Sequence, residues 1–211
     1  GKGWGKVGVW ESQAIELRGW GACDGDRAES YRTNFAHGPA AIADVNGDGA
    51  MEVVATGNVY DCAVGHPPGK YNGVYVFNAD RSRFVADGYD WQTLPVDTGA
   101  PLSEDWNVIQ NAQPNPVLAD LDGDGEKEIL YASYDGRMHA FWLDKTEHYN
   151  WPYSVYPGGL DYRFASEPTV ADLDNDGDAE VIFGSWVKNG SHQTGKLHVL
   201  DYQGNVLHTV N

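Results

Sequence analysis

Three short acidic segments of the 211-residue chain share the pattern Asp-x-Asp/Asn-x-Asp-Gly-x-x-Glu, which could bind a metal ion. We number the pattern as positions 1 to 9 and call the segments loop 1 (residues 44–52), loop 2 (120–128) and loop 3 (172–180). Positions 1, 3 and 5 can direct three side-chain oxygens toward one centre, and glycine at position 6 permits a left-handed backbone. About six hard oxygen ligands on a flexible loop suit Ca²⁺, whereas Mg²⁺ requires a tighter octahedron.

The sequence therefore predicts three Ca²⁺ sites, one in each loop. An EF-hand shares the first six positions, but its bidentate glutamate stands at position 12 between helices, so we reject that motif. Three copies in register argue against an ordinary Asp-Gly turn. The predicted ligands are the residues at positions 1, 3, 5, 7 (through the carbonyl oxygen) and 9: Asp44, Asn46, Asp48, Ala50, Glu52, Asp120, Asp122, Asp124, Glu126, Glu128, Asp172, Asp174, Asp176, Asp178 and Glu180.

The net charge of the chain limits the classes of partner that it is expected to bind. Thirty-one acidic residues against 14 Lys and Arg give a net charge of −17. Nucleic acid and an anionic membrane surface would both be repelled, so neither is expected as the main partner. No apolar run approaches 18 residues, and no membrane span is expected.

Each acidic loop lies in the same sequence context, which predicts a four-stranded antiparallel meander. A short apolar run precedes the loop, a β-branched run follows it, and a third and a fainter fourth strand come next. The first strands are expected at 41–43, 117–119 and 169–171, and the second at 53–55, 129–131 and 181–183. The third are expected at 73–77, 138–142 and 196–200, and the fourth near 91–96, 151–156 and 206–210.

Repeated meanders of this kind indicate an all-β fold made of β-propeller blades. Three blades are predicted over residues 37–112, 113–166 and 167–211, each with one calcium loop. Residues 1–36 lack the loop, and strands at 7–10 and 14–17 could belong to a partial blade or entry segment. About three and a half blades are too few to close a ring, because propellers have roughly four to eight.

The loops and their flanking strands resemble the FG-GAP/VCBS repeat, the unit of the integrin α-subunit β-propeller. The resemblance covers residues 37–211 and implies that each loop joins the first two strands of a blade and binds Ca²⁺ on one face of the propeller. The Phe-Gly and Gly-Ala-Pro signatures of the family are mostly missing, and Phe183-Gly184-Ser185 is the nearest match.

The expected calcium affinity indicates where the protein is located, and that location in turn indicates whether the two cysteines form a disulfide. Loops of the extracellular type bind Ca²⁺ at about 10⁻⁴ to 10⁻³ M, and cytosolic Ca²⁺ would leave such sites empty. We therefore expect an extracellular or cell-surface protein. That location favours a Cys23–Cys62 disulfide, although two buried thiols or half of a metal site are alternatives.

Other candidate site residues are less specific. No nucleophile, zinc or phosphate-binding motif is present. His139 and His198 occupy equivalent third-strand positions, which favours packing over catalysis. Six aromatic residues could form a sugar-stacking or docking face, but we favour a role in the cores between blades: Trp106, Trp142, Tyr149, Trp151, Tyr153 and Trp186. The long loops 58–72 and 97–111 offer the candidate ligand-binding residues His66, Glu104, Asp105 and Trp106.

Three functions are consistent with these patterns. The favoured one is a non-catalytic, calcium-stabilised module for adhesion that binds a protein or a glycan outside the cell. The second is a structural subunit of an extracellular filament or surface layer, because exposed blade edges promote self-assembly. The third is an enzyme fragment that resembles a polysaccharide lyase, although the strong negative charge disfavours an acidic sugar as substrate.

Overall fold

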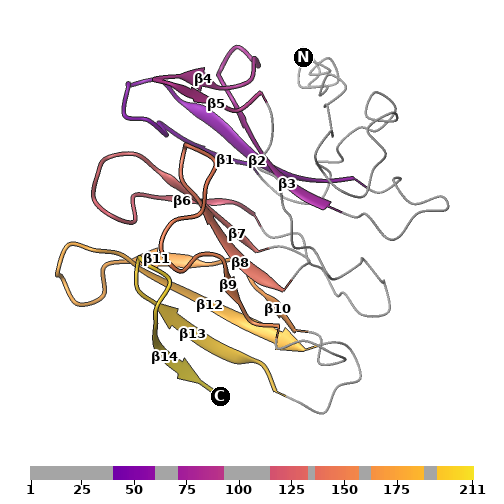
Figure 1. Cartoon of the computed structure of the whole chain (residues 1–211), viewed down its shortest axis with the longest axis vertical. Helices are drawn as coiled ribbons and strands as arrows, with labels where there is room; N and C mark the ends of the chain where they lie inside the picture. The colour runs from indigo at the N-terminus through magenta and orange to yellow at the C-terminus, as the bar shows by residue number, and fades with distance from the viewer. Residues whose placement is uncertain (1–39, 60–70, 93–114, 133–135, 157–162, 188–193) are drawn as a thin grey trace, which may run out of the picture.

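The computed structural model describes residues 40–59, 71–92, 115–132, 136–156, 163–187 and 194–211. Over these residues the fold is all-β, with 14 strands in antiparallel sheets and no helix (Figure 1). The prediction of an all-β fold is therefore confirmed. We describe it as unit 1 (residues 40–92), unit 2 (115–156) and unit 3 (163–211). No helix suited to crossing a membrane occurs in the described part of the chain.

Unit 2 is the four-stranded antiparallel meander that the sequence predicted. Its strands pair in chain order, each with its neighbour. The strands are β6 (Val117–Ala119), β7 (Glu128–Ala132), β8 (Arg137–Phe141) and β9 (Tyr153–Ser154). Every residue of β7 is buried, because a strand in the middle of stacked sheets is covered on both faces.

Unit 1 departs from the predicted meander. Its main sheet has three strands, β1 (Ala41–Ala43), β2 (Glu52–Val59) and β3 (Tyr71–Phe77). The fourth strand predicted near 91–96 is absent at the described residues 91 and 92, and 93–96 lie outside the described part of the chain. A separate hairpin of β4 (Val85–Ala86) and β5 (Tyr89–Asp90) precedes that point instead. Asp87 and Gly88 close it with φ of 52° and 93°, the Asp-Gly turn that favours a two-residue hairpin.

Unit 3 has five strands rather than four. β11 (Thr169–Ala171) pairs with the first half of β12 (Glu180–Val187), and β10 (Arg163–Ala165) pairs with the second half. β13 (Lys196–Leu200) and β14 (Val206–Val210) then complete the sheet over the residues that were predicted. The two short strands pair with different halves of the long β12. The sequence pattern predicted only β11 before this strand and did not predict β10.

The same four-residue tight turn follows the third strand of every unit, at residues 78–81, 142–145 and 201–204. Its fourth residue has positive φ in all three copies, at Arg81 (80°), Lys145 (67°) and Gly204 (79°). In units 1 and 2 an aspartate just before it, Asp80 or Asp144, accepts a hydrogen bond from the backbone N–H two residues on. An aspartate favours such turns because its carboxylate satisfies a nearby backbone donor.

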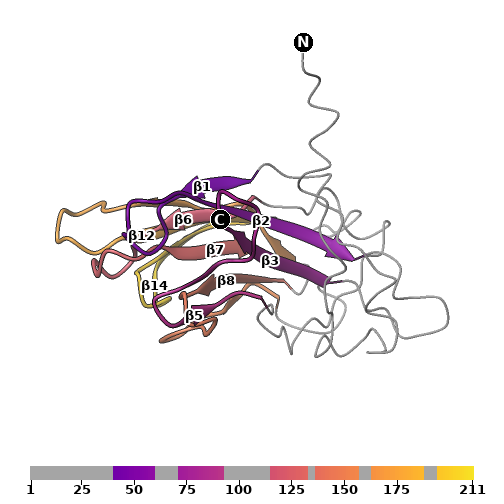
Figure 2. The same cartoon turned by 90° about the horizontal axis from the view of Figure 1, so that it is seen from above.

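The main sheets of units 1, 2 and 3 lie side by side in chain order, and the acidic loops extend from the same side of the stack (Figures 1 and 2). One apolar core fills the space between units 1 and 2, and a second fills the space between units 2 and 3. Each unit therefore stabilises its neighbour by burying one face of its sheet.

A buried tryptophan links each unit to the next. The indole N–H of Trp91 donates to the carbonyl oxygen of Leu143 in unit 2, at 2.9 Å. The indole N–H of Trp151 donates to the carbonyl oxygen of Tyr202 in unit 3, also at 2.9 Å. Both acceptors are the second residue of the tight turn, so the two bonds are repeats of one contact.

Several predictions fall outside the described residues. They concern the partial blade at residues 1–36, the Cys23–Cys62 disulfide, and the loop residues His66, Glu104, Asp105 and Trp106. The blade boundaries and the number of blades remain predictions.

The tryptophan contact predicts a measurable loss of stability. Replacing Trp151 with phenylalanine removes the hydrogen bond and leaves a cavity, so the free energy of unfolding should fall by about 1–3 kcal/mol. Urea denaturation measures this difference. Tyr149→Phe removes only a hydroxyl from an exposed ring and should change stability by less than about 0.5 kcal/mol. Equal effects of the two substitutions would show that the tryptophan contact contributes nothing specific.

Candidate metal centres

Each acidic loop connects the first and second strands that flank it, β1 to β2, β6 to β7 and β11 to β12. The glycines at position 6 have φ of 90°, 98° and 102°, as their residue type predicted. Position 4 is also left-handed, with φ of 73° at Gly47, 75° at Gly123 and 62° at Asn175. The sequence signal for position 4 was present, because glycine and asparagine tolerate this conformation best.

The loops have the same internal hydrogen bonds. The carboxylate at position 1 accepts a bond from the glycine N–H at position 6, at 2.8, 3.0 and 3.2 Å in loops 1, 2 and 3. The carboxylate at position 5 accepts one from the N–H at position 7, at 2.7, 2.8 and 2.9 Å. These bonds hold the loop backbone around the carboxylates at positions 1 and 5.

The glutamate at position 9 is buried in every loop. Glu52, Glu128 and Glu180 each begin the strand after the loop, and one carboxylate oxygen accepts a hydrogen bond from the N–H at position 2. The distances are 3.1, 2.6 and 2.7 Å. This bond leaves the second carboxylate oxygen of each glutamate for another partner.

Buried oxygens without a hydrogen-bond partner occur at positions 1 and 3. They are Oδ1 of Asn46, Oδ1 of Asp120 and Oδ1 of Asp122. A buried acceptor that loses its bond to water costs about 1–3 kcal/mol, and a charged one costs more. No described residue donates a hydrogen bond to these three oxygens, although Lys127 Nζ lies 3.8 Å from the other carboxylate oxygen of Asp120.

The predicted ligands at positions 1, 3 and 9 lie together as carboxylate clusters in two of the loops, whereas Asp124 and Asp176 at position 5 are not part of these clusters. Asp120, Asp122 and Glu128 each offer an oxygen within 4.8 Å of the others. The corresponding oxygens of loop 3 come from Asp172, Asp174 and Glu180, also within 4.8 Å of one another. Loop 1 has asparagine at position 3, so its equivalent set mixes an amide oxygen with carboxylates.

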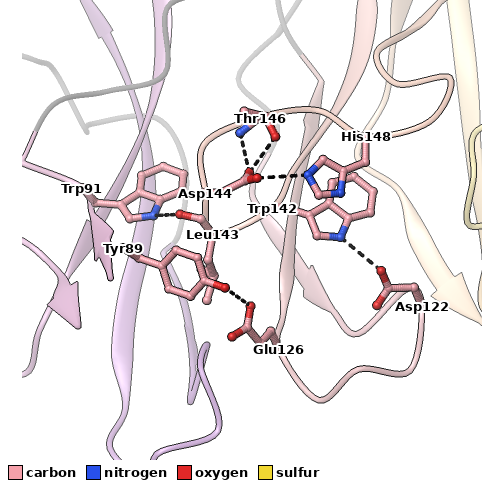
Figure 3. A network of polar contacts seen from close by, with 9 residues as sticks. All are labelled: Tyr89, Trp91, Asp122, Glu126, Trp142, Leu143, Asp144, Thr146 and His148. Carbon is pink, nitrogen blue, oxygen red and sulfur yellow. Dashed lines mark hydrogen bonds and ion pairs between the residues drawn. The ribbon is translucent and has the colours of Figure 1, made fainter. Parts of the chain in front are cut away.

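Side chains around loop 2 hold its acidic groups in place (Figure 3). The indole N–H of Trp142 donates to Oδ2 of Asp122 at 3.2 Å, which leaves Oδ1 as the partnerless oxygen. Trp142 is itself stacked on His148, whose Nε2 lies 3.1 Å from Asp144. The hydroxyl of Tyr89 in unit 1 donates to Glu126 at 2.8 Å.

Loop 1 has a comparable support. The side-chain nitrogen of Asn46 donates to Asp87 at 2.7 Å, from the turn of the β4–β5 hairpin. Donation from the amide nitrogen directs the amide oxygen to the other side. The hairpin absent from the sequence prediction therefore orients a predicted ligand, as outer groups do in metal sites.

Burial, with smaller contributions from the carboxylates of Asp122, Asp124 and Asp120, raises the pKa of Glu128 to about 8. The N–H of Leu121 opposes this shift by stabilising the charged form. Burial also raises the pKa of Glu52, although the N–H of Val45 lowers it. A cation close to loop 2 would reverse this penalty, because it favours the ionised carboxylate.

The other candidate residues pack in the cores. His139 and His198 are buried and stacked on Tyr131 and Phe183, as the packing hypothesis predicted. Trp142 and Trp151 are also buried, in agreement with the core role that was favoured for the aromatic residues. Tyr153 and Trp186 are half-buried, and only Tyr149 among the described members of that set is an exposed side chain.

The pKa of Glu128 predicts how pH affects the metal-free protein. Its ordinary value is 4.5 and its folded value is about 8. The neutral acid therefore contributes stability below about pH 4.5, and that contribution is lost as pH rises through about 8. The increase in melting temperature caused by Ca²⁺ should grow across this window, since the cation requires the ionised form.

Calorimetric titration in two buffers of different ionisation enthalpy should detect proton release when Ca²⁺ binds near neutral pH. Glu128→Gln should remove most of the release, because glutamine has no proton to lose. A calcium effect that does not vary with pH would contradict this prediction.

Sequence comparison agrees with the geometry of the loops. Residues 120–183 match the family model of the FG-GAP-like repeat, from the first aspartate of loop 2 to Phe183 in β12. No curated protein matches the chain by sequence. The predicted resemblance is confirmed over this span, and the chain carries FG-GAP-like repeat sequence at residues 120–183, where the second and third acidic loops lie.

Proposed function

We propose that loops 1, 2 and 3 each bind one Ca²⁺ ion. The observation that carries the proposal is the set of buried oxygens of Asn46, Asp120 and Asp122 that have no hydrogen-bond donor. A divalent cation would satisfy them with hard oxygen ligands, which Ca²⁺ prefers. The set of ligands is the one predicted from the pattern, with the carbonyl oxygen at position 7 included.

Backbone and side-chain groups outside the proposed ligand set hold the proposed Ca²⁺ ligands in place. Backbone N–H groups fix positions 1, 5 and 9, while Trp142 and Asp87 orient the residues at position 3 in loops 2 and 1. A bound Ca²⁺ neutralises the repulsion among carboxylates that are packed at one edge of the sheets. Because each loop joins two strands, this neutralisation stabilises the sheet itself.

We further propose a non-catalytic module of the β-propeller type that binds a protein or a glycan outside the cell. The FG-GAP-like repeat at residues 120–183 supports the type of module. Calcium loops of low affinity would be occupied outside the cell, which supports the location. The long loops with His66, Glu104, Asp105 and Trp106 remain the proposed ligand-binding segments.

The chemistry of the buried Ser185–His198 pair favours this choice over an enzyme. The Ser185 hydroxyl lies 2.9 Å from Nε2 of His198, the spacing of a nucleophile and its base. The other ring nitrogen faces the hydroxyl of Tyr153 at 3.3 Å rather than a carboxylate. Both members of the pair are buried between units 2 and 3, so a substrate has no direct access to them.

Saturating Ca²⁺ should raise the melting temperature relative to chelator, and about three ions should bind per chain. With dissociation constants near 10⁻⁴ to 10⁻³ M, about 10 mM Ca²⁺ adds roughly 1.4–2.7 kcal/mol per site. Calorimetry measures the number of ions, and thermal unfolding measures the stabilisation. An unchanged melting temperature would refute the proposal.

Loop 3 offers a matched pair of variants. Asp174→Ala removes a predicted ligand at position 3 and should abolish one of the three calcium sites. Asp178→Ala removes the same charge from the same loop but keeps the carbonyl at position 7, so three ions should still bind. Equal losses in the two variants would mean that only the overall negative charge attracts Ca²⁺.

A further inference from the structure

The β4–β5 hairpin of unit 1 contacts two different acidic loops. Its turn residue Asp87 accepts a hydrogen bond from the side-chain nitrogen of Asn46 in loop 1, at 2.7 Å. Two residues later, the hydroxyl of Tyr89 donates to the carboxylate of Glu126 in loop 2, at 2.8 Å (Figure 3). Asn46 and Glu126 are both proposed calcium ligands, at position 3 and position 7. One hairpin therefore holds a ligand residue of two sites.

The hairpin is itself anchored between the units. Trp91 directly follows β5 and is fully buried, and its indole N–H donates to the carbonyl oxygen of Leu143 in unit 2. The backbone N–H of Trp91 donates to the carbonyl oxygen of Phe84, just before β4, at 2.9 Å. Phe84 is also buried, with 1% of its surface exposed. Any displacement of the hairpin would break these contacts, so its turn is held in a defined position.

Loops 1 and 2 also contact each other through their backbones. The carbonyl oxygen of Val45 at position 2 of loop 1 accepts a hydrogen bond from the N–H of Lys127 at position 8 of loop 2, at 2.8 Å. A Cβ atom on Gly47 in loop 1 would lie 3.7 Å from the carbonyl oxygen of Gly125 in loop 2. The two loops are therefore joined both directly and through the hairpin.

Loops 2 and 3 share the backbone contact but not the side-chain link. The N–H of Ala179 donates to the carbonyl oxygen of Leu121 at 3.4 Å, the only hydrogen bond between loop 3 and unit 2 in the described part of the chain. Tyr149 is the equivalent of Tyr89, because each stands two residues before the buried tryptophan of its unit. Yet Tyr149 is 56% exposed, and its hydroxyl has no hydrogen bond among the described residues.

We propose that the β4–β5 hairpin couples loops 1 and 2, so that Ca²⁺ bound at one loop increases the affinity of the other. This inference deepens the proposed function and rests on it. An ion at loop 1 fixes Asn46 and with it the turn at Asp87, and Tyr89 then holds Glu126 in place. A loop whose ligand residues are already held loses less conformational freedom when its own ion binds. The coupling is reciprocal, so an ion at loop 2 favours loop 1 by the same factor.

Electrostatic repulsion between two bound ions acts in the opposite direction, because the first ion reduces the negative potential that attracts the second. Salt screens this repulsion, with a screening length of about 8 Å at 0.15 M, whereas the short hydrogen bonds of the hairpin do not depend on it. The coupling should therefore be measured at about this ionic strength.

Nuclear magnetic resonance can follow each site through the amide signal of its glycine at position 6, and so gives a dissociation constant for each loop. Asp44→Ala removes a ligand of loop 1 and should raise the calcium dissociation constant of loop 2 about fivefold. The emptied loop keeps two carboxylates, whereas the loaded loop has three and a divalent ion, so charge alone would not weaken loop 2. Asp172→Ala in loop 3 should change loop 2 less than about twofold, since only the backbone contact joins that pair.

Tyr89→Phe tests the hairpin link without changing a charge or a proposed ligand. In this background, Asp44→Ala should weaken loop 2 by less than about twofold, because only the backbone contact then remains. Tyr149→Phe is the matched control, since it removes a hydroxyl at the equivalent position of unit 2. The fivefold effect of Asp44→Ala should persist in that background.

The outcomes separate this inference from the proposed function. If Asp44→Ala leaves the affinity of loop 2 unchanged, or if the fivefold effect survives Tyr89→Phe, the coupling by the hairpin is overturned while calcium binding stands. If Ca²⁺ shifts none of the three glycine signals in the unmodified chain, both proposals are refuted. Dispersed amide signals confirm that a variant is folded. Should Asp44→Ala not fold, the reciprocal variant Asp120→Ala, followed at Gly49 of loop 1, tests the same coupling.

Discussion

The hydrogen bond between the glutamate at position 9 and the N–H at position 2 is the contact on which the rest of each unit depends. It fixes the end of the acidic loop against the start of the second strand. In loops 1 and 2 the residue at position 2, Val45 or Leu121, then directs its side chain into the core and its carbonyl oxygen toward the next unit. Loop geometry, core packing and contact between units therefore meet at one residue in each of these two loops.

The cost of this arrangement is electrostatic. A buried glutamate lies beside three aspartates in loop 2, and burial raises its pKa to about 8 in the absence of a cation. Backbone N–H groups and the Trp142 indole compensate part of that cost. The remaining oxygens without a hydrogen-bond donor are the ones that the proposed Ca²⁺ ions would bind.

Sequence predicted the parts of the fold that depend on local chemistry. Strands β1, β6, β11, β13 and β14 lie at the predicted residues, since short apolar runs between turn residues define them. The β4–β5 hairpin was missed although Asp87-Gly88 signals it, and β10 was missed because its pairing with β12 depends on distant residues. The predicted ligands at positions 1, 3 and 9 lie together in loops 2 and 3. The supports from Trp142 and Tyr89 could not be predicted, because they come from other strands.

The tryptophan contacts have a consequence for how such a chain can change over evolutionary time. Each one joins a unit only to its immediate successor, from the indole of Trp91 or Trp151 to the same point of the following turn. A gene duplication that copies one whole unit would therefore copy both halves of a working contact. An insertion within a unit is more restricted than such a duplication, because it must leave the strand–loop–strand segment and the tight turn in register.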